Sequence, residues 1–329
     1  MTKLGERSLT SIYAPIEKEL SEFNGALRAQ LNSNDGLIAS IHEHLLKMTG
    51  KALRPALAIF ASKIGPKPRP AEVIRLAVAV ELIHTATLVH DDIIDDSELR
   101  RNQPTLYSKW GTEISIVSGD YLYAKAFLAL ASLKDLWVYE AFAACAHLIC
   151  EGEMKQIEKR ANFVMSEEDY LKIIHQKTAA LFQASAMGGA YFAGSSPEQV
   201  RALGDYGYAL GMAFQIVDDC LDIVGETESL GKTSGLDIYK SDVTLPVLYL
   251  FHGLKEPERA ALLAEIRQSK EGVFEKMKTR ILESRSYERA MDKARTFIDS
   301  AHQALRGVDD SPYKESLTNL AHHCLDRVR

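Results

Sequence analysis

Residues 72–92 read EVIRLAVAVELIHTATLVHDD, and this stretch is apolar on nearly every side of the helix that it predicts. A helix with apolar residues all round is buried among other helices rather than lying on a surface. Residues 206–217, YGYALGMAFQIV, have the same character. The two stretches therefore predict a helical bundle with both of these helices at its centre.

The rest of the chain also favours helices. Ala, Leu, Glu, Lys and Arg are frequent, and Gly and Pro fall mainly between helical segments. Although 329 residues allow two domains, no low-complexity linker divides the chain. We predict one all-α domain over residues 1–329, a single large bundle of about ten to a dozen helices. Beyond about residue 255 the segments are more charged and amphipathic, which predicts an outer layer.

The composition excludes several classes of protein. With 46% hydrophobic and 26% charged residues, the chain is neither disordered nor collagen-like. A net charge of −6 without a basic segment argues against a nucleic-acid partner. The four cysteines form no C-x-x-C pair, so we expect neither a disulfide scaffold nor a zinc site. This use of cysteine fits a protein in a reducing compartment.

The sequence carries no signal for export or membrane insertion that we can identify. Its start lacks the apolar run of a signal peptide. Its longest uncharged apolar stretches fall short of the roughly 20 residues that a spanning helix needs. We therefore expect a soluble cytoplasmic protein with no transmembrane segment.

Both buried helices end in an acidic cluster of the form D-D-x-x-D. Side chains four residues apart share a helix face, and like charges at that spacing destabilise a helix by about a few tenths of a kcal/mol. The helix dipole also disfavours anions near a C-terminus. A solvated charged face is the simpler interpretation, but clusters that follow buried apolar runs predict bound cations. The candidate metal ligands are Asp91, Asp92, Asp95, Asp218, Asp219 and Asp222.

The ligand set indicates a hard cation because it consists of oxygen atoms alone. Neither cluster has the D-x-D-x-D-G pattern of a calcium loop. Mg²⁺ commonly combines one or two carboxylates with water and substrate phosphates. Two acidic clusters facing each other in a bundle therefore predict two or three Mg²⁺ ions that bridge a diphosphate. We expect Cys220, between two of the aspartates, to be a packing residue, because thiolates suit softer metals, and His90 to be structural.

Basic residues lie near the acidic clusters in the sequence. Each alone is more often a surface residue, but together they predict an anion site in which Arg makes bidentate contacts and Lys acts as a point charge. The candidates are Lys51, Arg54, Arg100, Arg101, Lys177 and Lys232.

At these positions the sequence resembles the trans-prenyl diphosphate synthase family, the polyprenyl synthetases. The matching stretches are GKALRP (50–55), IHTATLVHDDIIDDSELRRNQPT (83–105), QKTA (176–179), FQIVDDCLDI (214–223), GKTSGLD (231–237) and VTLP (243–246). The resemblance implies an all-α bundle of the isoprenoid synthase type around a deep central cavity, in a homodimer. It also implies an enzyme that condenses isopentenyl diphosphate in trans onto an allylic diphosphate.

The resemblance assigns roles to individual residues. It implies that Mg²⁺ on the aspartates binds the allylic diphosphate together with Arg100, Lys177 and Lys232. It implies that Thr178 and Gln215 lie beside the allylic carbon. The residues implied to hold the diphosphate of isopentenyl diphosphate are Lys51, Arg54, His84 and Arg101.

The length of the product depends, in this family, on side chains about one turn before the first acidic cluster. This chain has Ala86 and Thr87 there, where short-chain enzymes tend to carry an aromatic residue. Small side chains predict an open tunnel and a product of about six to ten isoprene units (C30 to C50), grown from farnesyl or geranylgeranyl diphosphate. The alternative is that Ala is simply a good helix former. Quinone side chains are the common use of such products, and a lipid product allows transient membrane contact.

One position departs from the family pattern. Many relatives carry Lys two residues before the Thr of TLP, where this chain has Asp242. The Asp at position 242 reverses the charge of a side chain that contacts the allylic diphosphate in the family. Lys240, two residues away, is a candidate to replace that Lys.

Several other functions share part of the pattern. They are a shorter-chain farnesyl or geranylgeranyl synthase, a class I terpene cyclase, an HD-type metal phosphohydrolase and a non-catalytic subunit of a heteromeric synthase. The second D-D-x-x-D cluster and the Lys51, Arg54 and Arg101 set favour elongation.

Overall fold

The computed structural model describes residues 8–48, 50–224, 242–268 and 272–326. In chain order the elements are α1 (Leu9–Tyr13), the 3-10 turn η1 (Ala14–Ile16), α2 (Glu17–Gln30), α3 (Gly36–Lys47), α4 (Leu53–Ser62), α5 (Pro70–Ile94), β1 (Leu99–Arg100), β2 (Gln103–Pro104), α6 (Leu106–Ser132), α7 (Leu136–Glu158), α8 (Glu167–Ile174), the π turn η2 (His175–Ala179), α9 (Ala180–Phe192), α10 (Pro197–Val224), α13 (Leu245–Gly253), α14 (Glu256–Gln268), α15 (Val273–Glu283), α16 (Ser286–Ala304), the 3-10 turn η3 (Leu305–Gly307) and α17 (Pro312–Asp326). The predicted all-α class is confirmed.

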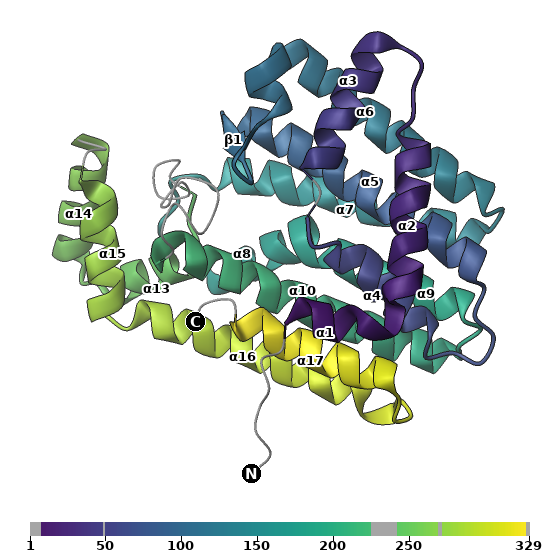
Figure 1. Cartoon of the computed structure of the whole chain (residues 1–329). Helices are drawn as coiled ribbons and strands as arrows, with labels where there is room; N and C mark the ends of the chain where they lie inside the picture. The colour runs from purple at the N-terminus through teal and green to yellow at the C-terminus, as the bar shows by residue number, and fades with distance from the viewer. Residues whose placement is uncertain (1–7, 49, 225–241, 269–271, 327–329) are drawn as a thin grey trace.

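The two apolar stretches form the central helices α5 and α10, as predicted. α5 packs against α2, α4, α6 and α9, and α10 packs against α9, α16 and α17. Figure 1 shows α16 and α17 running side by side along the lower edge, with α1 next to α17. The amphipathic α16 buries Ala290, Ala294, Ile298 and Ala301 and lies outside α10, in agreement with the predicted outer layer.

Two helices are longer and more apolar than the uncharged stretches of the sequence predict. By length and composition alone, α5 and α6 could each cross a membrane. The apolar window of α5 is 67% buried inside the protein, which identifies it as a core helix, whereas that of α6 is only 33% buried. α6 therefore leaves part of an apolar surface uncovered.

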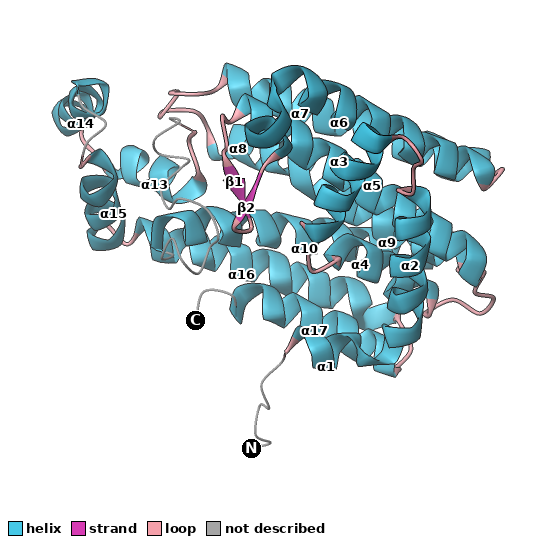
Figure 2. Ribbon diagram, turned by 45° about the horizontal axis from the view of Figure 1, so that its top comes forward, coloured by secondary structure: helices cyan, strands magenta, loops and turns pink. Residues whose placement is uncertain are grey.

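A short hairpin between α5 and α6 was not predicted. β1 and β2 pair antiparallel, and Figure 2 shows them as two short strands among helices. The two residues of the turn, Arg101 and Asn102, have φ values of 53° and 59°. Positive φ at both positions matches the twist of a tight hairpin and suits Asn, but it strains an Arg. The hairpin fixes the Arg100–Arg101 pair beside the end of α5.

Close helix contacts are made where glycine replaces a side chain. A Cβ built on Gly189 of α9 would lie 2.1 Å from the carbonyl oxygen of Ala58 in α4. The two backbones therefore approach to a distance that only glycine permits, and this contact holds α4 and α9 together.

Candidate active site

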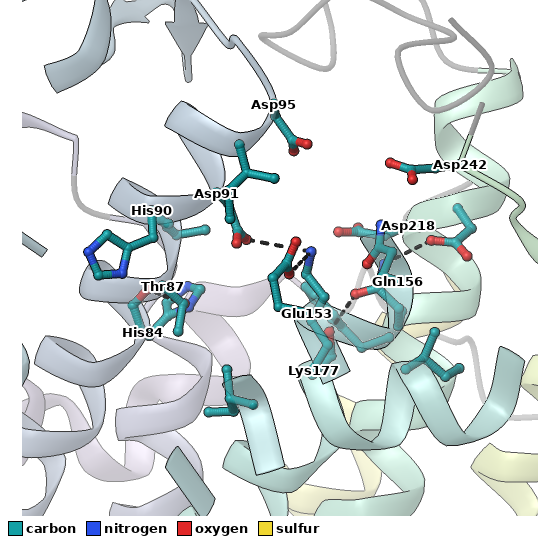
Figure 3. Close-up of a pocket in the computed structure, with 18 of the residues that line it drawn as sticks. His84, Thr87, His90, Asp91, Asp95, Glu153, Gln156, Lys177, Asp218 and Asp242 are labelled. Carbon is teal, nitrogen blue, oxygen red and sulfur yellow. Dashed lines mark hydrogen bonds and ion pairs between the residues drawn. The ribbon is translucent and has the colours of Figure 1, made fainter. Parts of the chain in front are cut away.

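A large open cavity lies at the C-terminal ends of the two central helices. Its volume is about 1510 Å³. Asp91 in α5 and Asp95 just after its end line it on one side, and Asp218 and Asp219 line it from α10. Figure 3 shows Asp91 and Asp218 on opposite sides, with their carboxylates turned toward the space between them. The structure therefore brings the two sequence-distant acidic clusters to one cavity.

Two members of the acidic clusters do not line the cavity. Asp92 is 3% exposed and is held by Arg100, whose Nε and a terminal nitrogen each lie 2.8 Å from the same carboxylate oxygen. Asp222 is 1% exposed within α10. Asp92 thus acts on the site through Arg100, which itself lines the cavity.

Asp219 belongs to a buried hydrogen-bonded chain. The Tyr170 hydroxyl donates to one of its oxygens (2.6 Å), and the Gln215 amide donates to the other (2.8 Å). Gln215 in turn accepts from the Thr178 hydroxyl (2.7 Å). Burial raises the pKa of Asp219 to about 7, although both hydrogen bonds act against that rise. These hydrogen bonds hold Thr178 and Gln215 side by side on the cavity wall. The resemblance to the prenyl diphosphate synthases implies that the allylic carbon lies beside them.

Lys177 projects toward the first cluster from the π turn η2. Its Nζ lies 3.9 Å from Asp91 and contacts the carboxylate of Glu153 (Figure 3). Burial opposes the positive charge, but Asp91 and Glu153 outweigh it and raise the pKa of Lys177. Burial also raises the pKa of Asp91, against the effect of Lys177 and Arg100. A permanent cation therefore stands next to the carboxylates that would hold Mg²⁺.

The remaining basic residues line the same cavity, and they are Lys51, Arg54, His84 and Arg101. An Arg54 terminal nitrogen lies 3.2 Å from Nε2 of His84. Burial lowers the pKa of His84, and the neighbouring arginines lower it further. His84 is therefore neutral at ordinary pH and accepts this hydrogen bond. Burial lowers the pKa of Arg54 to about 10, which still leaves it charged.

Further residues lie outside these sets. Lys232 and Lys240 are outside the described residues. Asp242 is buried on the cavity wall and accepts a hydrogen bond from Arg160. His90 lines the cavity, and its Nε2 lies 3.2 Å from the carbonyl oxygen of Ile116 in α6. Cys220 is fully buried, as expected of a packing residue.

The two small residues before the first cluster differ in position. Thr87 lines the cavity, but Ala86 is fully buried and does not line it. The expectation that Ala86 faces the product was wrong, because its side of α5 packs into the bundle. Thr87 faces the cavity, which Tyr123 and Ile149 also line.

Three residues at the site were not predicted from the sequence: Glu153 and Tyr170 line the cavity, and Arg160 contacts the lining residues Asp95 and Asp242. Glu153 and Arg160 belong to α7 and the segment after it, and Tyr170 belongs to α8. The only signal for Glu153 is a pair of acids in EGEMKQ at the end of an otherwise apolar helix. Each of the three contacts a residue more than twenty positions away in the sequence, and no local pattern predicts such a contact.

The fit to Mg²⁺ follows from the donor set. Within the described parts of the chain, no three His, Cys, Asp or Glu side chains form a metal cage by themselves. Carboxylates on two facing walls beside several cations match an ion that completes its coordination with water and substrate phosphates. The residues present therefore suit Mg²⁺ bound together with a diphosphate.

An all-α bundle with two acidic clusters and several basic side chains around one cavity defines a protein that binds divalent cations together with a phosphorylated substrate. The profile of the polyprenyl synthetase family matches residues 35–283. The chain is 35% identical to octaprenyl diphosphate synthase of Escherichia coli (strain K12) over 324 residues, which cover 98% of this chain and 100% of that one. The chain therefore belongs to the polyprenyl synthetase family and is a prenyltransferase.

Two other proteins bear on the finer assignment. A polyprenyl synthase from Caulobacter crescentus CB15, solved with calcium and isoprenyl diphosphate, superposes with a TM-score of 0.92 at 34% identity, covering 97% of this chain and 98% of that chain. A short chain isoprenyl diphosphate synthase from Methanothermobacter thermautotrophicus is 37% identical over 291 residues, covering 87% of this chain and 89% of that one. Overall similarity therefore does not separate long-chain from short-chain relatives.

Proposed function

We propose that this chain is a single-domain, Mg²⁺-dependent synthase that condenses isopentenyl diphosphate onto farnesyl or geranylgeranyl diphosphate and releases a long-chain polyprenyl diphosphate. The observation that carries the proposal is the meeting of both acidic clusters, Lys177 and Arg100 in one cavity of about 1510 Å³. Such a cavity has room for two diphosphates and a growing apolar chain.

The site would hold the allylic diphosphate between α5 and α10. Asp91, Asp95 and Asp218 would bind Mg²⁺, with Asp92, Asp219 and Asp222 as their neighbours in the clusters. When bound, Mg²⁺ neutralises the diphosphate and makes it a better leaving group. Lys177 and Arg100 would bind the same diphosphate from the side, together with Lys232. The charge that develops on the leaving oxygens thus meets groups already in place.

The second substrate would lie against Lys51, Arg54, His84 and Arg101. Neutral His84 accepts from Arg54 and so orients the guanidinium toward the cavity. The carbon–oxygen bond to the allylic diphosphate would break first and leave an allylic cation, which the double bond of isopentenyl diphosphate then attacks. A proton then leaves the new cation, and the released diphosphate is the base.

The wall around the reacting carbon protects the cation. Thr178 and Gln215 line the cavity, and their oxygens would stabilise the cation with their partial negative charge. The apolar side chains of Leu88, Ile149 and Phe214 line the same cavity and keep water away. Both features favour attack by the isoprenoid double bond over attack by water.

A long product is supported by the small Thr87 on the cavity wall. Quinone side-chain synthesis and a cytoplasmic location remain parts of the proposal. The short-chain relative makes a farnesyl or geranylgeranyl product the second candidate.

The homodimer is supported by the uncovered face of α6. Val117, Tyr121 and Leu128 follow helical spacing on one stripe and are 65%, 37% and 69% exposed. An apolar stripe on a long, mostly uncovered helix suits a second copy of the chain. Light scattering with size exclusion would give twice the mass of 36.6 kDa, and Val117→Glu would shift it toward the monomer.

The experiment that tests the function is an incubation with Mg²⁺, labelled isopentenyl diphosphate and either primer, followed by phosphatase treatment and sizing of the alcohols. Products of about C30 to C50 are expected, and EDTA or Asp91→Asn should abolish them. Products that stop at C15 or C20 would assign the short-chain function. Cyclic hydrocarbons that contain no labelled isopentenyl units would indicate a terpene cyclase. Product formation only after a second protein chain is added would indicate a subunit of a heteromeric synthase.

A further inference from the structure

One guanidinium links two walls of the cavity. Arg160 lies in the segment between α7 and α8. Its Nε donates to Asp242 (2.9 Å), and a terminal nitrogen donates to Asp95 (3.1 Å). Figure 3 shows Asp95 and Asp242 on opposite sides of the upper cavity, with their carboxylates turned toward each other. Arg160 therefore joins the first acidic cluster to the segment before α13.

The two contacts of Arg160 differ in their surroundings. The Asp242 side chain is 6% exposed, whereas that of Asp95 is 24% exposed. Burial raises the pKa of Asp242, and Arg160 acts against that rise. A buried carboxylate is costly unless a charged partner stays with it. Asp242 is therefore the firm anchor of Arg160, and Asp95 is the more exchangeable contact.

A cation that binds the first cluster competes for the exchangeable contact. Asp95 lines the cavity and belongs to the candidate metal ligands. If Asp95 held a divalent ion, its charge would repel the guanidinium of Arg160, which would keep its Nε bond to Asp242. Arg has five N–H donors in a planar fork, so the terminal nitrogens then have hydrogens to offer a new anion. The anion that arrives with the metal in this cavity is a diphosphate.

We propose that Arg160 is a substrate-binding residue that transfers its terminal N–H groups from Asp95 to the allylic diphosphate, with Asp242 as the positioning residue that holds it. The inference rests on the proposed function, because it requires a diphosphate between the acidic clusters. It also accounts for the reversed charge at Asp242. The negative side chain does not face the substrate alone, since it carries a cation supplied from another segment of the chain.

The test separates two roles for Arg160, which are binding the diphosphate anion and only neutralising the charge of Asp242. Inorganic diphosphate is titrated calorimetrically into the full-length protein with Mg²⁺, and thermal midpoints are recorded with EDTA. The variants are Arg160→Ala, Arg160→Ala with Asp242→Asn, and Arg160→Ala with Asp242→Lys. Arg295→Ala is the matched control, because it removes one exposed guanidinium that pairs with Asp292 on the outer helix α16.

Loss of a charge-assisted contact predicts that Arg160→Ala raises the Kd for diphosphate by roughly tenfold or more. Arg160→Ala alone leaves the buried carboxylate of Asp242 without its partner and should lower the thermal midpoint. The double variant with Asp242→Asn removes that charge as well, so it should regain the wild-type midpoint but not the wild-type affinity for diphosphate. The Lys double variant should return the Kd to within about threefold of wild type, and Arg295→Ala should leave it unchanged.

Two results would overturn the inference. Wild-type affinity in the Asn double variant would show that Arg160 only compensates Asp242. Failure of the Lys double variant to regain affinity, while it keeps the wild-type midpoint, would show that a cation at this wall does not bind the anion. Absence of diphosphate binding in the wild-type protein would be a different failure, because it contradicts the proposed function and the inference together.

Discussion

The Asp219 carboxyl group is nearly inaccessible to water and yet stands in the second acidic cluster, which makes Asp219→Asn an informative change. Asn has the same shape and no charge. Its carbonyl can accept from the Tyr170 hydroxyl, and its amide can donate to Gln215. Gln215 can then donate to Thr178, so the two bonds between position 219 and Thr178 reverse their direction while the bond from Tyr170 keeps its own.

The expected gain in stability follows from the pKa of Asp219. Burial raises it from the ordinary 3.8 to about 7, so the folded protein holds this proton more tightly than the unfolded chain. For a carboxyl shifted in this direction, stability is greatest below the unfolded pKa and is lost as pH rises toward 7. The full loss is about 4 kcal/mol, and the part that falls between pH 5 and pH 7 is about 2–3 kcal/mol.

The assay is urea denaturation with EDTA at pH 5 and pH 8, with Asp205→Asn as the control. Asp205 lies on the same helix and is exposed. The stability difference between Asp219→Asn and wild type should widen in favour of the variant by about 2–3 kcal/mol from pH 5 to pH 8. A difference that stays constant or narrows would refute the reasoning, since Asp219 would then be ionised without penalty. The control should show no widening.

Three further outcomes are expected. Thr87→Tyr should shorten the product by several isoprene units, measured by sizing of the alcohols, because the ring would occupy part of the cavity that Thr87 lines; an unchanged product would contradict that position for the tunnel. Lys177→Ala should lower kcat/KM for the allylic substrate at least tenfold, and unchanged kinetics would exclude the contact. Gly189→Ala should destabilise the protein by roughly 1–3 kcal/mol in urea through overpacking, whereas Gly25→Ala, in open space on α2, should stabilise it by about 0.5–1 kcal/mol; equal effects would argue against the α4–α9 contact.

The fold was largely predictable where the hydrophobic pattern is extreme. An all-round apolar helix has only one stable environment, so residues 72–92 identified the core of α5 (Pro70–Ile94). The stretch 206–217 identified only the middle of α10 (Pro197–Val224), because the helix begins with a more polar turn. The hairpin around Arg101 was not predictable, since a strained φ at an Arg depends on tertiary contacts such as that with the Met48 carbonyl.

The site was predictable where a repeated motif carries the chemistry. The paired D-D-x-x-D clusters identified Asp91, Asp95 and Asp218 on facing walls. Helical spacing could not show that Asp92 turns toward Arg100 instead of the cavity. The bridge made by Arg160 joins positions far apart in the chain, and no local pattern encodes such a contact.

The central claim is that both acidic clusters bind one metal–diphosphate unit. It is tested most directly by crystals grown with Mn²⁺ and an unreactive allylic thiolodiphosphate, in which anomalous scattering locates the metal. Metal peaks are expected next to Asp91 and Asp95 and next to Asp218, with diphosphate oxygens shared between them. Peaks at one cluster alone, or a diphosphate bound away from the cavity between α5 and α10, would contradict it.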